Sequence, residues 1–203
     1  MIKFLSIIFS ALLIFFGSCR KNKIENSKTI EKTSTLDSLK KVIFIRDKEY
    51  INQVWYYNKN GDLLDHKGFN FVIQCKDTFI VNKESIILVN QVVPFFKNQK
   101  SKIKVCLPRN DLLDFNIGFK NENDIEQVCF YNLETSGMNE KFDVERRYSV
   151  VFSKKFKLTG KKIIRAVLIE YLLSKNDTLG DHISLDSIHK SYLEIPVFVK
   201  DSI

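Results

Sequence analysis

Glycine, proline and histidine are scarce in this sequence. Its 203 residues include only 7 Gly, 3 Pro and 3 His. No glycine-rich loop of the kind that cradles a phosphate group is present, and no Gly-x-Ser-x-Gly motif of serine hydrolases occurs. The His-Glu-x-x-His pair of zinc hydrolases is also missing. These absences exclude the familiar signatures of nucleotide-binding and hydrolytic enzymes, so we expect no enzymatic activity, no cofactor and no metal site.

Two of the three histidines leave one catalytic alternative open. His182 and His189 lie seven residues apart, in a segment that also carries Asp177, Asp181 and Asp186. Imidazole and carboxylate groups bind divalent metals, so this segment is the candidate site for a hydrolase. Its Asp, Ser and Gly content is typical of a loop. We therefore expect a solvated loop here and keep the hydrolase as an alternative.

The first 18 residues have the composition of a secretory signal peptide. Lys3 supplies a positive charge, an apolar run of 13 residues extends from Phe4 to Phe16, and the small pair Gly17-Ser18 follows. A run of this length is too short to cross a bilayer, which needs about 20 apolar residues. We expect this segment to be removed when the protein is exported.

The stretch Phe16-Gly17-Ser18-Cys19 resembles the lipobox of bacterial lipoproteins, in which a bulky apolar residue and two small ones precede a cysteine. The resemblance covers residues 1–19. It implies cleavage before Cys19 and attachment of acyl chains to that residue, and more than one acyl chain anchors a protein stably to a membrane. Arg20 stands where an Asp often retains lipoproteins in the inner membrane, so the resemblance favours the outer membrane of the bacterial cell envelope. A secreted, unlipidated protein or an uncut anchor is the alternative.

The chain is rich in aromatic and basic residues. It has 17 Phe, 7 Tyr and one Trp, and its formal net charge is +8. Basic proteins bind nucleic acids, anionic lipids or acidic polysaccharides. Only 6 of the 32 basic residues are Arg, the side chain best suited to bidentate phosphate contacts. For an exported chain of this kind we expect no nucleic-acid partner, and we expect most of the charge on a solvated surface.

Alternation of apolar and polar residues predicts a β protein from Tyr50 onward. Asn60-Gly61 is a strong hairpin signal, because both residues accept positive φ. Pro196 has no backbone donor, which predicts a sheet edge or a bulge at that point. Many short strands without helical periodicity predict an all-β, antiparallel sandwich that resembles immunoglobulin-like modules. The expected strands are residues 50–58, 69–75, 86–93, 102–107, 127–132, 146–152, 163–173 and 192–199.

A weak internal repetition predicts how these strands are divided. Twice, an apolar segment is followed by a polar stretch and a closing strand, which favours two tandem sandwich units, residues 46–115 and 116–203. One larger sandwich is the alternative. Residues 19–45 are expected to form a lipidated, polar tether that lifts the folded part off the membrane. A short helix fits residues 35–45, although the β-branched run 42–45 suits a strand as well.

Three cysteines remain after Cys19. Alternation directs Cys75 toward a core, whereas Cys106 lies on a face that is rich in lysine. Side chains on such different faces pair badly, because a disulfide needs close Cβ atoms. Cys129 is ambiguous. An oxidising compartment permits a disulfide, but the sequence favours buried free cysteines.

Basic residues gather around one predicted turn, Thr159-Gly160. A basic hairpin tip can bind lipid headgroups, an acidic polysaccharide or an acidic protein, or it can simply keep a hairpin soluble. Trp55 is the candidate for an exposed aromatic that stacks on a glycan, with core packing as its alternative. The basic candidates for a binding site are Lys154, Lys155, Lys157, Lys161, Lys162 and Arg165.

These features predict a membrane-anchored envelope lipoprotein that binds a protein or an anionic glycan, or serves as a structural module, without catalysis. One alternative is an inhibitor or immunity-type periplasmic lipoprotein whose basic surface neutralises an acidic protein. The second alternative is an envelope hydrolase that uses the His182/His189 segment.

Overall fold

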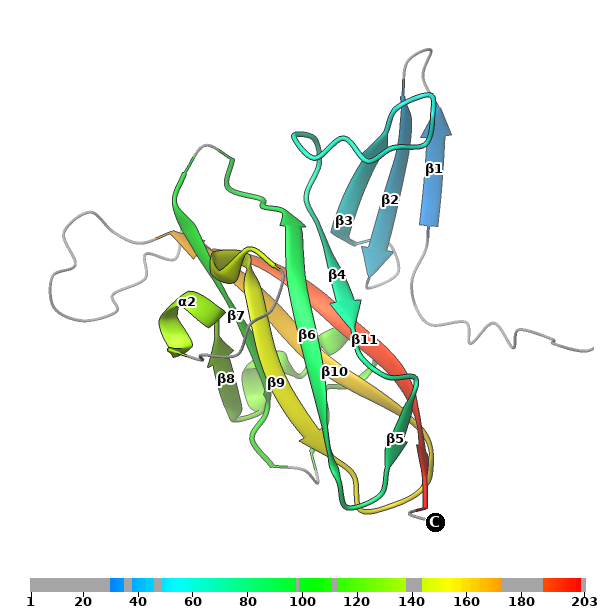
Figure 1. Ribbon diagram of the computed structural model, residues 1–203, viewed down its shortest axis with the longest axis vertical. Coiled ribbons are helices and arrows are strands. Elements are labelled where there is room, and N and C mark those ends of the chain that lie inside the picture. The colour runs from blue at the N-terminus through cyan, green and yellow to red at the C-terminus, as the bar shows by residue number, and fades with distance from the viewer. Residues whose placement is uncertain are drawn as a thin grey trace, which may run out of the picture.

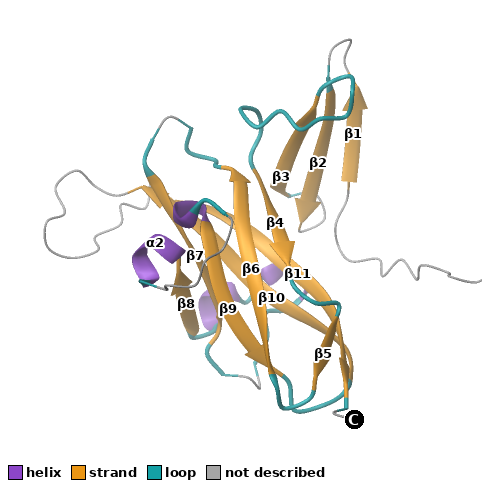
Figure 2. Ribbon diagram, viewed as in Figure 1, coloured by secondary structure: helices purple, strands orange, loops and turns teal. Residues whose placement is uncertain are grey.

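The computed structural model of the chain describes residues 30–34, 38–45, 49–97, 99–110, 113–137, 144–172 and 188–201. Strands make up most of these residues, and only short helical turns interrupt them (Figures 1 and 2). The expected signal peptide, Cys19 and His182 lie outside the described residues. Within the described part of the chain, no helix has the length and apolar character needed to cross a membrane.

The strands form three sheets. An N-terminal sheet has the order β1 (Ile30–Ser34), β2 (Leu39–Ile45), β3 (Tyr50–Tyr57). A five-stranded sheet has the order β5 (Thr78–Ile80), β11 (Ile188–Lys200), β10 (Gly160–Leu172), β7 (Ser101–Pro108), β8 (Gln127–Tyr131). A three-stranded sheet has the order β4 (Asn70–Gln74), β6 (Glu84–Val93), β9 (Ser149–Lys155). The connections contain the helix α2 (Leu133–Ser136) and the 3-10 turns η1 (Ile117–Phe119), η2 (Glu122–Asp124) and η3 (Arg146–Tyr148).

The main core lies between the five-stranded sheet and the sheet formed by β4, β6 and β9. On β10, alternation directs Ile164, Ala166 and Leu168 inward, where they join buried residues from β4, β6, β7, β9 and β11 in one cluster. The neighbouring strands are antiparallel, except that β5 and β11 are parallel. The all-β, antiparallel sandwich predicted from alternation is confirmed.

The expected division into two tandem units needs correction. Strand β6 pairs with β9 and strand β7 pairs with β10, so both pairs join residues from either side of position 115. One core cluster takes residues from Phe71 to Val199. The two segments therefore build a single sandwich, which was the alternative. Alternation within a strand specifies which side chains point inward, but it does not specify the partner strand, so it could not exclude the tandem arrangement.

The segment expected as tether and short helix contains two strands. β1 pairs with β2 over five residues, and β2 pairs in turn with β3. Val42 and Ile45 are buried, and the β-branched run at 42–45 favours the strand. The helix expected over 35–45 is therefore wrong for residues 39–45, and the tether expected over 19–45 is wrong for the residues of β1 and β2.

Asn52 joins the N-terminal sheet to the sandwich. Its side-chain Nδ2 donates to the backbone oxygen of Tyr192 at 2.9 Å, and its Oδ1 accepts from the Tyr192 backbone nitrogen at 2.6 Å. Ile45 packs in a second apolar cluster with Phe115, Phe119 and Tyr192, on the outer face of the five-stranded sheet. The N-terminal sheet thus packs against β11 and against the connection between β7 and β8.

The hairpin turn predicted after β3 is confirmed. Asn58 Oδ1 accepts from the backbone nitrogens of Asn60 and Asp62 at 2.8 and 2.9 Å. Gly61 has a φ of 88°, which glycine adopts without strain. Tight turns are often closed in this way, by an Asn side chain that accepts hydrogen bonds from backbone nitrogens a few residues further on.

Strand β11 is not an edge strand of its sheet, which differs from the expectation, but Pro196 lies at a point where β11 has no partner on its β5 side. Two residues further on, the Phe198 nitrogen donates to the Asp77 oxygen on the β5 side. Because backbone groups alternate along a strand, position 196 also faces that side, and the pairing of β5 with β11 begins only at Phe198. The missing donor of Pro196 therefore breaks no bond of the sheet.

One cysteine prediction is confirmed and one is wrong. Cys75 is a free cysteine at the edge of the main core, as expected. Cys106 and Cys129 are directly opposite each other on β7 and β8 and form a disulfide. The lysine-rich face of Cys106 was correctly predicted, but the strand that would lie beside it was unknown, and that register brings the second sulfur within reach.

Candidate functional site: a cationic cleft at one end of the sandwich

The lysine-rich segment, residues 154–162, joins two sheets and is not the tip of a two-stranded hairpin. β9 ends at Lys155 in the three-stranded sheet, and β10 begins at Gly160 in the five-stranded sheet. Residues 156–159 therefore cross from one layer to the other at the lower end of the molecule in Figure 1. This corrects the expected hairpin, and it places the basic residues beside the opening between the layers.

A cleft of about 960 Å³ lies at this end of the sandwich. Its walls come from residues 154–158 and 161–165, in and on both sides of the crossing segment, and from residues 107–110 and 113–114, at the end of β7 and after it. All six basic residues predicted as a binding site line it, and Arg109 adds a seventh basic side chain. Asp114 is the single carboxylate in the lining described here. A cleft lined mainly by one sign of charge concentrates ions of the opposite sign.

The inner lining of the cleft is apolar. Leu107 and Ile164 are only 4% and 3% exposed, and both belong to the main core as well as to the cleft. Phe156 also lines the cleft and packs partly against that core. Two further leucines in the lining, Leu113 and Leu158, are 50% and 70% exposed. The cleft therefore combines buried apolar side chains with a large number of basic side chains.

Arg165 is engaged in ion pairs within the wall. Its Nε lies 3.2 Å from Glu194 Oε1 and its Nη1 lies 2.9 Å from Asp114 Oδ2. Burial raises the pKa of Asp114, while the charges of Arg165 and Lys154 oppose that rise. Arg165 thus ties the segment after β7 to β10, and its charge is balanced by these carboxylates.

The lysines supply the net positive charge of the cleft. Lys155, Lys157 and Lys161 are exposed and Lys162 is half-buried. None of these four lysines has an ion-pair partner among the residues that the structure describes. Their charges are therefore available to an anion from solution.

Trp55 lies on a different surface, one face of the N-terminal sheet. Lys41 lies on the central strand β2. It is directly opposite Trp55 on β3 at one side and directly opposite Lys32 on β1 at the other. The rings of Trp55 and Tyr57 are parallel within 5°, with centroids 6.4 Å apart. Trp55 is half-buried, and its Nε1 donates to Gln53 Oε1 at 3.1 Å. This face is therefore both aromatic and basic.

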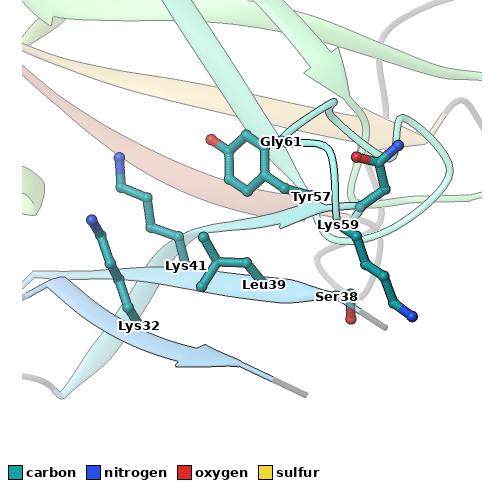
Figure 3. Close-up of a pocket in the computed structure, with 8 residues that line it drawn as sticks. Lys32, Ser38, Leu39, Lys41, Tyr57, Lys59 and Gly61 are labelled. Atoms are coloured by element: carbon teal, nitrogen blue, oxygen red, sulfur yellow. The ribbon is translucent and has the colours of Figure 1, made fainter. Parts of the chain in front are cut away.

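A smaller hollow of about 530 Å³ adjoins that face. Figure 3 shows Lys32 and Lys41 on neighbouring strands projecting to the same side as Leu39 and Tyr57, which also line it. In Figure 1, β3 and the crossing from β9 to β10 lie at opposite ends of the molecule. The predicted binding residues thus fall on two separate surfaces, with the six basic residues together and Trp55 apart.

His189 does not lie in a loop, which corrects the expectation for its segment. It is part of β11, and its ring stacks on Phe95 with centroids 3.8 Å apart. Phe69 meets it edge-on at 4.9 Å. Burial lowers the pKa of His189 to about 4, so the ring is neutral at pH 7. Across the described residues, no group of three or more His, Cys, Asp or Glu side chains is placed to hold a metal ion.

The sequence carries no local signal for the part of the cleft that follows β7. Arg109, Leu113 and Asp114 are about 45 residues away from the lysine cluster along the chain, and only the pairing of β7 with β10 brings them beside it. No local pattern signals that approach. Leu158 had a usable signal, because it is a large apolar residue inside a run of lysines at a turn.

No protein-family model, no curated protein and no solved structure matches this chain. The sandwich architecture is shown by the structure, and the closer resemblance to immunoglobulin-like modules stays a prediction.

Proposed function

We propose that this protein is a lipid-anchored, non-catalytic binding protein of the bacterial cell envelope that holds an anionic partner in the cationic cleft. The observation that carries the proposal is the cleft lining, in which, among the residues that the structure describes, seven basic side chains accompany one carboxylate. Four of the lysines have no ion-pair partner in the described chain. Scattered solubilising charge would not collect around one apolar cleft in this way.

Export and anchoring are supported by two independent features. The lipobox-like stretch ends at Cys19, and the Cys106–Cys129 disulfide suits an oxidising compartment outside the cytoplasm. Ile30, at the start of β1, lies 11 positions after Cys19, and a chain of that length spans at most about 40 Å. The folded part would therefore work within a short distance of the membrane, and Arg20 favours the outer membrane.

Charge reversal in the cleft tests the proposal. The triple variant Lys157→Glu, Lys161→Glu, Lys162→Glu should bind an anionic polysaccharide and phosphatidylglycerol vesicles at least about tenfold more weakly than the wild type at physiological salt. Both proteins are held in neutral nanodiscs by their acyl anchors, and in that form neither should bind neutral dextran or added phosphatidylcholine vesicles. The measurement is equilibrium binding at several salt concentrations, since an ionic interaction weakens as salt rises.

A matched variant controls for the change in total charge. Reversal of Lys67, Lys100 and Lys120, three exposed lysines away from the cleft, alters the net charge equally and should leave binding almost unchanged. An equal loss in both variants would mean that only total charge matters, and the proposal would fail. The inhibitor alternative predicts instead that small anionic probes do not bind while an acidic envelope protein does.

A further inference from the structure

The cationic cleft has an apolar interior that a purely ionic partner would leave unused. Resting on the proposed function, we infer that the ligand is an anionic amphiphile: a molecule with an alkyl or acyl chain and a phosphate or carboxylate headgroup. The chain would lie against the apolar lining between the two layers, and the headgroup would lie among the lysines. The combination of these two linings in one cleft carries the inference.

The apolar residues of the lining include both core residues and exposed residues. Leu107 and Ile164 are core residues that also line the cleft, so the cleft reaches the space between the layers. Leu113 is half exposed to water and Leu158 mostly exposed, although both lie in the same lining. An alkyl chain that covered them would gain about fourfold in affinity for each methylene group removed from water.

The basic groups are arranged for a headgroup at the surface end. Lys155, Lys157 and Lys161 are exposed, whereas the apolar residues that line the interior are buried. Asp114, the carboxylate that would repel an anion, is paired with Arg165. A charged headgroup would therefore meet lysines near water, while the attached chain would reach apolar side chains.

The size of the cleft also fits a small amphiphile. A volume of about 960 Å³ is at the upper end of ordinary small-molecule sites, which run from about 300 to 1,000 Å³. A polysaccharide or an acidic protein surface would have little use for buried leucine and isoleucine. We therefore favour a single amphiphilic molecule over a polymer.

Three soluble probes separate the contributions of chain and headgroup. The mature, lipidated protein in neutral detergent-free nanodiscs is titrated with monomeric dodecyl phosphate, inorganic phosphate and the neutral amphiphile dodecyl maltoside, each below its micelle concentration. Dodecyl phosphate should bind at least about 60-fold more tightly than inorganic phosphate, which corresponds to the burial of about three methylene groups. Phosphatidylglycerol vesicles form a fourth arm, which reports whether the ligand is taken from a bilayer or from solution.

Paired variants test the position of the chain. Leu113→Ser with Leu158→Ser should weaken dodecyl phosphate binding at least about tenfold and leave inorganic phosphate binding unchanged. Both leucines are largely exposed, so the fold should tolerate the substitutions. Ile86→Ser with Ile117→Ser removes two equally exposed aliphatic side chains outside the cleft and should have no effect.

The outcomes distinguish this inference from the proposed function. Equal affinity for dodecyl phosphate and inorganic phosphate would overturn the inference but leave a cationic anion site in place. Equal affinity for dodecyl phosphate and dodecyl maltoside would overturn it as well, because the headgroup charge would then be irrelevant. Failure of every anionic probe, vesicles and polysaccharide included, would overturn both.

Discussion

His189 is surrounded by aromatic rings on several sides. Phe95 stacks on it from the connection between β6 and β7, Phe69 meets it edge-on from before β4, and Tyr50 lies 6.3 Å away on β3. The ring of His189, on β11, thus contacts residues from three other parts of the chain. Burial is the cause of its lowered pKa of about 4, and the Ser191 hydroxyl, 3.5 Å from its Nε2, is a weak polar neighbour.

The pH dependence of stability should report this burial. The folded-state pKa of His189 is about 4 and its ordinary value is 6.5, so below pH 6.5 the unfolded chain binds the proton more readily than the folded one. Stability from this residue is fully present above pH 6.5 and is lost as pH falls toward 4. We expect the free energy of unfolding to drop by about 2 kcal/mol between pH 7 and pH 5 because of this group.

Urea unfolding at a series of pH values measures the effect. His189→Phe should be less sensitive to pH in that range, whereas His66→Asn, at an exposed position, should keep the wild-type dependence. An unchanged pH profile in His189→Phe would show that the ring is not a buried neutral group in solution.

Gly68 is required by a close approach between two backbones. Its φ is +78°, and a Cβ atom there would lie 2.2 Å from the Val54 backbone oxygen. That contact lies beside the bridge between Val54 and Phe69, which carries the chain from β3 toward β4. Gly68→Ala should therefore cost about 2–3 kcal/mol of unfolding free energy.

Gly61→Ala is the matched control for that substitution. Gly61 also has positive φ, at +88°, but a Cβ atom there meets nothing within 4 Å. Chemical denaturation should show a loss of only about 1 kcal/mol, the cost of the backbone conformation alone. Equal losses for the two variants would contradict the close approach at Gly68.

At the scale of elements, the disulfide closes the segment that forms one wall of the cleft. Cys106 on β7 and Cys129 on β8 are separated by 23 residues, and the enclosed stretch includes Arg109, Leu113 and Asp114. The bond therefore restrains the cleft wall as well as the pairing of the two strands. Reduction should lower stability by about 3 kcal/mol, because the unfolded chain regains the freedom of that loop.

Thiol counting and binding together test the disulfide. Protein extracted from membranes and denatured without reductant should expose one reactive thiol, from Cys75. The double variant Cys106→Ala, Cys129→Ala should be less stable and should bind anionic probes more weakly, whereas Cys75→Ala should bind like the wild type. Three reactive thiols in the denatured, unreduced protein would contradict the assignment.

Local patterns predicted individual strands well and their partners poorly. The expected strand 50–58 is β3 at Tyr50–Tyr57, and 102–107 is β7 at Ser101–Pro108, because alternation within a strand is a property of neighbouring residues. β5 was missed because it has only three residues, Thr78–Ile80. Which strand pairs with which depends on contacts distant in sequence, so the single sandwich, the disulfide and the non-hairpin crossing could not be read from one sequence.

At the scale of the whole molecule, the fold separates two basic surfaces. The lysine cluster was visible in the sequence, but its apolar interior comes from residues of β7 and β10 that meet only in the folded protein. Trp55 and its lysine neighbours face solvent on the N-terminal sheet, far from the cleft in Figure 1. The cleft is the surface on which charge, depth and apolar lining coincide, and it is therefore the one on which the proposed function rests.

Photo-crosslinking in living cells tests that claim most directly. A benzoyl-phenylalanine placed at Leu158, in the cleft, is compared with one at Ile117, which is exposed elsewhere. The account predicts a discrete, anionic adduct at position 158 that disappears when Lys157, Lys161 and Lys162 are changed to Glu, and no such adduct at position 117. The same adduct at both positions, or none at 158, would contradict it.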